Sequence, residues 1–445
     1  MSALVWFRRD LRLADNPAWA AATAEHDEVA ALFVLDRRLL SGAGEMRRNH
    51  LLANLHALDA ELRELGGGLT MASGDPAALV PHMASHHDVV FWNRDYTPFS
   101  RRRDKAVAAG IKPEIETFDG NVVHAPEVVL TGGGTPYRVF TPYYRTWNST
   151  PVEPWPRAGQ ATITGHRGIE IPSFHQPVPS AGEVGARDRL MRFLDIVDDY
   201  EADRNRPDLD RTSRLSADLK FGTISARAVA EQVGGTTAGR QAFVRQLAWR
   251  DFYAQVLFHA PHTTDHAFRS DLESIVWADD DEAVAAWKDG RTGYPIVDAG
   301  MRQLRTEGWM HGRVRMITAS FLVKDLGVDW RVGERHFRRL LIDADTAQNV
   351  GNWQWVAGTG ADAAPYFRIM NPVSQSRRFD PAGDYIRRYV PELAALSGPE
   401  IHAPWERPLE TAASGVTLGD TYPCPMIDHA EARQITLRRF EAAKG

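Results

Sequence analysis

The amino-acid sequence predicts two architectures in one chain: an α/β N-terminal domain, Rossmann-like with a parallel, doubly wound sheet, and an all-α C-terminal domain. Over the first 120 or so residues, short apolar segments alternate with helical patterns, whereas strand patterns are absent from about residue 185 onward. Strands that are separated by helices of about 10–20 residues are typical of a parallel sheet covered on both faces.

Four short apolar or β-rich segments are the expected strands: Ala3–Phe7, Val29–Leu35, Val89–Trp92 and Glu114–Phe118. Between the second and third, leucines recur at helical spacing over Glu45–Leu65, which predicts an amphipathic helix there. Three consecutive glycines at 66–68 follow this pattern and predict its end.

The composition changes between residues 131 and 184. Three consecutive glycines at 132–134 and eight prolines between positions 136 and 179 predict a long irregular connector. From residue 185 the patterns are helical almost to the end. We therefore expect an α/β domain at 1–130, an interdomain linker at 131–184 and a helical domain at 185–445.

The overall composition limits the class of protein. The chain has 445 residues and a formal net charge of −6 at pH 7. Its single cysteine, Cys424, excludes a disulfide framework, a cysteine-ligated zinc finger and an iron–sulfur cluster. Neither a secretory signal nor an apolar stretch of 18 residues is visible. We expect a monomeric cytoplasmic protein with no membrane association and no bound metal.

Residues 212–216, with the sequence TSRLS, bring three hydroxyls and a guanidinium together just before a helical pattern. Such a cluster can hold a pyrophosphate at the start of a helix, or it can simply cap that helix. Tyr200, with Arg204 one turn later, precedes this cluster by 12 residues and could add another phosphate contact.

Two later segments combine aromatic and polar side chains. Residues 343–355 bring two aspartates, several amides and two indoles together, which favours a polar pocket for a flat heteroaromatic ligand over a plain core helix. The helical pattern at Phe243–Phe258 places Gln246, Trp249, Arg250 and Tyr253 on one face, which suits stacking on a base.

Several long motifs resemble those of photolyases and cryptochromes. They are VWFRRDLR at 5–12, TSRLS at 212–216, WRDFY at 249–253, TGYPIVDAGMRQL at 292–304, GWMHGRVRMITASFLVKDL at 308–326 and NWQWVAGTGADAAPYFRIMNP at 352–372. The resemblance covers nearly the whole chain. It is closest to the bacterial class I enzymes that split cyclobutane pyrimidine dimers in DNA with blue light.

This resemblance implies that the helical domain binds FAD and DNA. The residues that would contact FAD are Tyr200, Thr212, Ser213, Arg214, Leu215, Ser216, Arg315, Asp343, Asp345 and Asn349. Asp343 would pair with Arg315. Asn349 would face flavin N5, where photolyases carry Asn, plant cryptochromes tend to carry Asp and animal ones Cys, so Asn349 favours repair over sensing.

The resemblance also implies two further roles for aromatic residues. Trp353, Trp330 and Trp277 match the relay that carries an electron from the surface to photoexcited flavin. UV-damaged DNA would be the partner, and its dimer would flip out of the duplex against Trp249 and Trp355. The other residues expected near the dimer or the DNA backbone are Arg204, Gln246, Tyr253, Gly312, Arg313, Met316 and Gln375.

Two positions depart from the dimer-splitting pattern. The family usually has Glu where this chain has Gln246, and Asn where it has Gly312. Both changes reduce hydrogen bonding to a damaged base, so a cryptochrome-type blue-light receptor with weak or no repair activity is the alternative. A dark FAD oxidoreductase is a third possibility, disfavoured because no credible NAD site is visible.

An antenna pigment is also implied for the N-terminal domain. Phe33, Arg48, Asp95 and Lys220 stand where deazaflavin-binding relatives place their contacts. Lys220 favours 8-hydroxy-5-deazaflavin, because folate-binding relatives tend to lack this lysine. FMN, folate or an empty antenna site are the alternatives.

Overall fold

The computed structural model describes every residue except 166–167, 176–177, 179, 366–367 and 444–445. The chain forms two compact units. The first comprises Met1–Asp199, Ser213–Pro261 and Ile342–Ala347, and the second comprises Tyr200–Thr212, His262–Leu341 and Gln348–Gly445. The sequence predicted boundaries after residues 130 and 184, whereas this division places residues 131–199, 213–261 and 342–347 with the α/β part.

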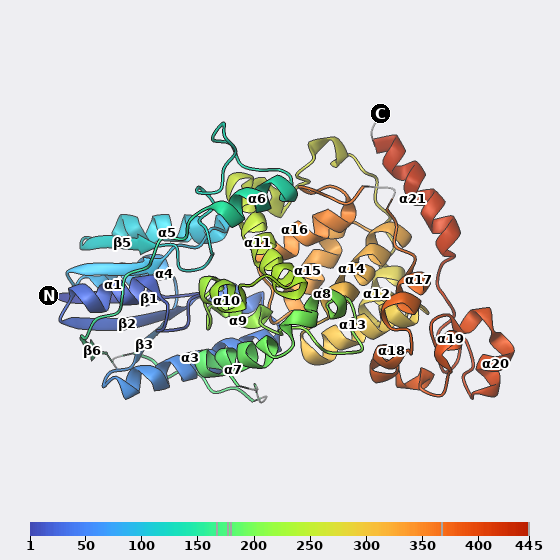
Figure 1. Ribbon diagram of the computed structural model, residues 1–445, viewed down its shortest axis with the longest axis horizontal. Helices are drawn as coiled ribbons and strands as arrows, with labels where there is room; N and C mark the ends of the chain where they lie inside the picture. The colour runs from blue at the N-terminus through green and yellow to red at the C-terminus, as the bar shows by residue number, and fades with distance from the viewer. Residues whose placement is uncertain (166–167, 176–177, 179, 366–367, 444–445) are drawn as a thin grey trace. The chain divides into compact units, whose positions relative to one another are not determined.

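The first unit contains a parallel sheet in the order β3-β2-β1-β4-β5, which confirms the predicted fold class (Figure 1). A sixth strand, β6, pairs with Glu28–Ala30 of β2, and β3 pairs with Ala31–Leu35 of the same strand. The strands are β1 (Ser2–Phe7), β2 (Glu28–Leu35), β3 (Leu69–Ser73), β4 (Val89–Asn93), β5 (Glu114–Phe118) and β6 (Thr162–Thr164).

Helices cover both faces of this sheet, as the alternation of side chains along parallel strands requires. Val5 and Phe7 of β1 point into a core that also contains Leu55 and Leu58 of α3. Leu4 and Trp6 point the other way, into a core shared with α4 and α5. The helices of this unit are α1 (Pro17–Glu25), α2 (Arg37–Ser41), α3 (Glu45–Glu64), α4 (Pro76–Ala84), α5 (Pro98–Gly110), α6 (Phe140–Ser149), α7 (Gly182–Leu194), η1 (Val197–Asp199), α9 (Ser216–Phe221), α10 (Ala226–Val233) and α11 (Ala238–His259).

Two sequence-based expectations about this unit need correction. The connector at 131–184 is not irregular throughout, because its residues form α6 and β6. The strand β3 directly follows the glycines that end α3 and was not predicted. Its five residues, LTMAS, contain a single β-branched side chain, so local pattern gives it little support. Pairing with β2 decides its conformation.

A close backbone approach joins α9 to the end of β1. Gly222 ends α9 in the left-handed region with φ of 71°, and a Cβ there would lie 2.0 Å from the carbonyl oxygen of Arg9. Only glycine fits this contact. The backbone N–H of Leu11 donates to the carbonyl of Phe221 at 3.1 Å, so the last turn of α9, with Lys220, is held beside the residues that follow β1.

The second unit is helical, as predicted, and no strand occurs among its described residues. A π-helical turn, η4, separates α14 from α15, and the C-terminal helix α21 packs against it. The elements are α8 (Tyr200–Asp203), η2 (Pro261–Thr264, whose first residue belongs to the first unit), η3 (Ser270–Leu272), α12 (Asp281–Asp289), α13 (Pro295–Glu307), α14 (Gly312–Ser320), η4 (Phe321–Asp325), α15 (Trp330–Leu340), α16 (Thr346–Ala357, whose first two residues belong to the first unit), α17 (Pro372–Phe379), α18 (Asp384–Tyr389), η5 (Pro391–Leu393), α19 (Gly398–Ile401), η6 (Pro404–Glu406), α20 (Pro408–Ala413) and α21 (His429–Ala443).

In the described part of the chain, no helix combines the length and the apolar character that crossing a bilayer requires. The described residues also contain no group of three or more His, Cys, Asp or Glu side chains that could hold a metal ion.

Candidate functional site

The TSRLS segment forms a strained local turn before α9. Arg214 has φ of 54°, in the left-handed region that residues other than glycine rarely adopt. The Ser213 hydroxyl oxygen accepts from the Leu215 N–H at 3.3 Å. The Thr212 hydroxyl oxygen is buried and has no hydrogen-bond partner among the described residues. Because a buried hydroxyl without a partner is costly, Thr212 is suited to a hydrogen bond from or to a bound group.

Tyr200 begins α8, the short helix at the start of the second unit, and Arg204 directly follows this helix. Tyr200 is buried, and this burial raises the pKa of its hydroxyl to about 12, so it is a neutral donor at physiological pH. Arg204 is half-buried and lies 3.7 Å from the carboxylate of Glu201.

One face of α11 carries the predicted stacking residues of the first unit. Trp249 is half-buried, and its indole stacks on Phe140 of α6 with 3.8 Å between ring centroids and 10° between planes. Tyr253, one turn later, is buried, with its ring 5.4 Å from that of Trp249. Gln246 is half-buried and donates to the carbonyl of Ala242 at 3.4 Å, within the helix.

The first turns of α14 carry three of the predicted DNA-binding residues. Gly312 is exposed, and Met316 is half-buried. Arg313 donates to Asn205 Oδ1 at 2.7 Å and lies over the Phe379 ring at 4.5 Å. Burial lowers the pKa of Arg313 to about 10, and other guanidiniums contribute to the shift. The arginines that contribute are Arg204, Arg378 and Arg368.

This arginine cluster is a basic site within the second unit. The positive charges of these three arginines lower the pKa of Arg313, so they lie near enough to it for the charges to interact. Gln375, on α17, is half-buried. The sequence singled out Arg204 and Arg313 as DNA contacts, and the structure brings both into one electrostatic cluster.

The helix α16 carries Asn349, Trp353 and Trp355. Asn349 Nδ2 donates to the backbone carbonyl of Glu334 at 3.0 Å and to its carboxylate at 2.9 Å. Both amide protons are therefore used, and the oxygen Oδ1 is the group that Asn349 can offer to a ligand. Glu334 is buried, and its burial raises the pKa of its carboxyl group. Trp355 is half-buried.

The three tryptophans of the predicted relay differ in exposure. Trp353 and Trp330 are 2% and 1% exposed, whereas Trp277 is half-buried and packs edge-on to Phe440. Of the three, Trp277 has the greatest access to solvent, which is the property a terminal electron donor needs. Trp353 lies edge-on to a further indole, that of Trp287, with 6.2 Å between ring centroids.

Two known families match separate parts of the chain. The family described as DNA photolyase matches residues 3–160, and the FAD binding domain of DNA photolyase matches residues 243–442. The chain is 40% identical to a deoxyribodipyrimidine photo-lyase of Agrobacterium fabrum, over 99% of this chain and 98% of that relative. The chain belongs to the photolyase/cryptochrome family.

Solved structures of this family have the same fold. A bacterial class III photolyase from Agrobacterium tumefaciens gives a TM-score of 0.91 at 38% identity, covering 100% of this chain and 98% of that one. A cryptochrome from Synechocystis gives a TM-score of 0.91 at 28% identity, with 98% of both chains covered. Both branches of the photolyase/cryptochrome family are therefore represented among its structural neighbours.

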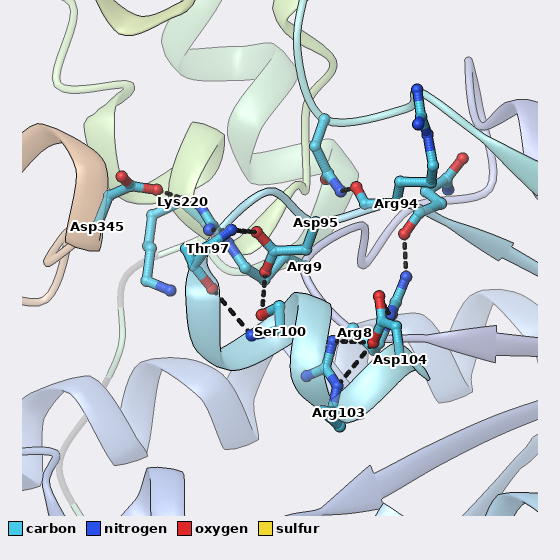
Figure 2. A network of polar contacts seen from close by, with 12 residues as sticks. Arg8, Arg9, Arg94, Asp95, Thr97, Ser100, Arg103, Asp104, Lys220 and Asp345 are labelled. Carbon is cyan, nitrogen blue, oxygen red and sulfur yellow. Dashed lines mark hydrogen bonds and ion pairs between the residues drawn. The ribbon is translucent and has the colours of Figure 1, made fainter. Parts of the chain in front are cut away.

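Two of the four predicted antenna residues meet in an ion-pair network of the first unit (Figure 2). Arg9 donates to Asp95 at 3.4 Å, to the backbone carbonyl of Lys220 at 3.3 Å, and to the carboxylate of Asp345. Ser100, in the first turn of α5, donates to the other oxygen of Asp95 at 2.8 Å. The network joins segments that are more than 330 positions apart in the sequence.

The charges of this network shift the pKa values of its members. Burial alone would raise the pKa of Asp95, but the Arg9 and Arg103 guanidiniums and the Ser100 hydroxyl outweigh it and hold that pKa below its usual range. Burial, together with a smaller contribution from repulsion by Arg9, lowers the pKa of Lys220 to about 7. A Lys220 ammonium would therefore gain from an anionic ligand.

Phe33, Arg48 and Asp343 are further predicted site residues of the first unit. Phe33 belongs to the core between the sheet and α1 and α3. Arg48 is exposed on α3 and donates to the carbonyl of Ala43 at 2.7 Å. Asp343 is buried. Its predicted ion pair with Arg315 would join the two units and stays a prediction.

Sequence reasoning missed several residues that position the site. Arg9, Phe140, Trp287 and Glu334 each contact a predicted site residue. Arg9 lies within the VWFRRDLR motif at 5–12, but nothing in its local sequence indicates its partners. Phe140 lies in the segment predicted as an irregular linker, in which the sequence indicated no site residue.

Proposed function

We propose that this protein repairs cyclobutane pyrimidine dimers in DNA under blue light. The observation that carries the proposal is the 40% identity to a deoxyribodipyrimidine photo-lyase over 99% of the chain. When bound and reduced, FAD would provide light-driven one-electron chemistry for opening the cyclobutane ring, with no net change of oxidation state. No nucleophile or metal is needed for this reaction.

The chain's residues fit FAD in two respects. Within the part of the chain that the structure describes, the buried Thr212 hydroxyl lacks a hydrogen-bond partner. It lies in the segment proposed to hold the FAD phosphates with Ser213, Arg214 and Ser216. Asn349 offers Oδ1, an acceptor, because Glu334 takes both of its amide protons. An acceptor matches reduced flavin, in which N5 carries a proton. Tyr200, Leu215, Arg315, Asp343 and Asp345 complete the proposed contacts.

The proposed substrate contacts divide into those for the base and those for the backbone. The half-buried indoles of Trp249 and Trp355 present flat apolar surface on which an extruded pyrimidine can stack. Arg204 and Arg313 lie in the basic cluster and would bind phosphates. Gln246 would offer one donor and one acceptor to the pyrimidine edge.

A first experiment tests the cofactor. The purified protein is denatured, and the released flavin is separated and identified. We expect non-covalent FAD. Recovery of FMN alone, or of no flavin after reconstitution, would reject the proposed cofactor.

A second experiment tests repair. The reduced protein is illuminated with blue light in the presence of dimer-containing DNA, and the return of thymine absorbance is followed, with a dark sample and undamaged DNA as controls. We expect a light-dependent rise. A protein that contains reduced FAD and binds DNA but restores no absorbance would contradict repair and favour the receptor.

The cryptochrome-type receptor is a second candidate because of Gln246 and Gly312, the two departures from the dimer-splitting pattern. The structural neighbour from Synechocystis is a cryptochrome. We retain repair as the first candidate because Asn349 is the residue that photolyases carry at the N5 position.

An antenna pigment is proposed in the first unit, with 8-hydroxy-5-deazaflavin favoured over FMN, folate or none. Asp95 and Lys220, which are joined through Arg9, are the residues on which this proposal depends. Phe33 and Arg48 complete the proposed contacts.

A further inference from the structure

The stacked pair of Phe140 and Trp249 joins two elements of the first unit. Phe140 is the first residue of α6, and Trp249 lies in the middle of α11. Their ring centroids are 3.8 Å apart at an interplanar angle of 10°, which is direct face-to-face contact. The face of the Trp249 indole that Phe140 covers is therefore closed to a ligand. A base can contact only the parts of the indole that Phe140 leaves uncovered.

Phe140 is itself held firmly. It is 5% exposed, and its ring contacts those of Tyr143, Tyr144 and Phe252 in addition to Trp249. Trp249, in contrast, is half-buried. The pair thus consists of a buried ring that fixes a partly exposed one, rather than of two equivalent core residues.

A second set of contacts anchors α6 to α11. The indole N–H of Trp147, on α6, donates to the carboxylate of Asp251 at 3.0 Å. The same carboxylate oxygen accepts from the backbone N–H groups of Val123 and His124 at 3.0 and 3.1 Å. Asp251 is two residues from Trp249, so the anchor of α6 and the ring that α6 supports lie on the same stretch of α11.

We propose that Phe140 is a positioning residue for the pyrimidine dimer, because it fixes the orientation of the Trp249 indole before the damaged base arrives. The inference rests on the proposed function. A preoriented ring does not lose rotational freedom when the base stacks on it, so binding is stronger than with a ring that must be ordered first. The segment predicted as a linker therefore contributes to substrate recognition.

The test compares Phe140→Leu with Phe258→Leu in the full-length protein with FAD bound. Phe258 is the control because it is a phenylalanine of the same unit, lies on the same helix as Trp249, and has its own ring contacts with Tyr96 and Arg101. The affinities for dimer-containing DNA and for undamaged DNA are measured, together with the repair rate at saturating dimer.

Phe140→Leu should weaken binding to dimer-containing DNA by about two- to tenfold relative to the control, the range for loss of one aromatic pair. Binding to undamaged DNA should not change, because phosphate contacts are untouched. The repair rate at saturation should also stay the same. Equal dimer affinity in the two variants, or a lower saturating rate or loss of FAD in Phe140→Leu alone, would overturn the proposal.

A second measurement reports on the ring itself without any DNA. In protein labelled with 5-fluorotryptophan, the Trp249 resonance is assigned by its absence in Trp249→Phe. It should shift in Phe140→Leu and stay in place in Phe258→Leu, because a ring at 3.8 Å exerts a ring-current effect. An unchanged resonance would refute the positioning role alone, whereas a wild type that does not prefer dimer-containing DNA would refute the proposed function as well.

Discussion

Replacement of the buried Lys324 by Met should remove a pH dependence of stability. Lys324 lies in the π-helical turn η4 and is 1% exposed. Its Nζ donates to the carbonyl of Ala357 at 2.9 Å and lies 3.7 Å from the centroid of the Phe440 ring. Among the described residues, no carboxylate forms an ion pair with it. Burial lowers the pKa of Lys324 to about 7.

The sign of the effect follows from proton binding. The unfolded chain keeps this proton up to its ordinary pKa near 10.5, whereas the folded protein releases it above about 7. The unfolded state therefore binds more protons between these values, and a rise in pH favours the folded state. Each pH unit in this range changes the free energy of unfolding by about 1.4 kcal/mol. Between pH 7.5 and 9, the free energy of unfolding of wild type should therefore rise by roughly 2 kcal/mol relative to that of Lys324→Met.

Urea-induced unfolding at pH 7.5, 8.25 and 9, followed by circular dichroism, measures this difference. Methionine suits the test because it is unbranched and carries no charge. The substitution removes the hydrogen bond from Lys324 to Ala357, which lowers the free energy of unfolding by the same amount at every pH. Lys105→Met, an exposed position on α5, is the control and should keep the wild-type slope. The reasoning would be refuted if the free energy of unfolding changed with pH in the same way for wild type and for Lys324→Met.

Three further predictions concern the site. Trp353→Phe should block photoreduction of oxidised FAD and leave repair by the pre-reduced protein largely intact, because the relay serves activation only; equal loss of both activities would contradict this division. Lys220→Ala should weaken binding of a deazaflavin antenna, measured by absorbance after reconstitution, and wild-type affinity in the variant would argue against the proposed antenna site. Gln246→Glu combined with Gly312→Asn should tighten dimer binding by roughly 1–3 kcal/mol through added hydrogen bonds. A Cβ at Gly312 meets no atom within 4 Å, so the first atom of a side chain has room there. Unchanged dimer affinity would show that these side chains do not face the lesion.

Local pattern in the sequence determined the secondary structure of the α/β part to a large extent. The apolar segments at 3–7, 29–35, 89–92 and 114–118 lie in strands, and the leucine repeat at 45–65 lies in α3. These elements were predictable because short apolar or β-rich segments are typical of strands and apolar residues at helical spacing are typical of an amphipathic helix. The strand β3 was not, because its conformation depends on pairing with β2.

The motifs of the sequence also determined the family and the candidate residues. The hydroxyls of TSRLS, the amides and indoles of residues 343–355, and the aromatic face of α11 were all visible as residue types at particular spacings. Residue type and spacing specify what chemistry a segment can supply. They do not specify which distant segment orients it.

The tertiary structure alone decided those partners. Arg9 bonds to Asp345 across 336 positions, Asp251 anchors α6 across 104, and Phe140 stacks on Trp249 from a segment expected to be irregular. Glu334 orients Asn349 from a neighbouring helix. Contacts of this kind arise when whole elements pack, and each depends on the relative placement of two backbones that local sequence does not encode.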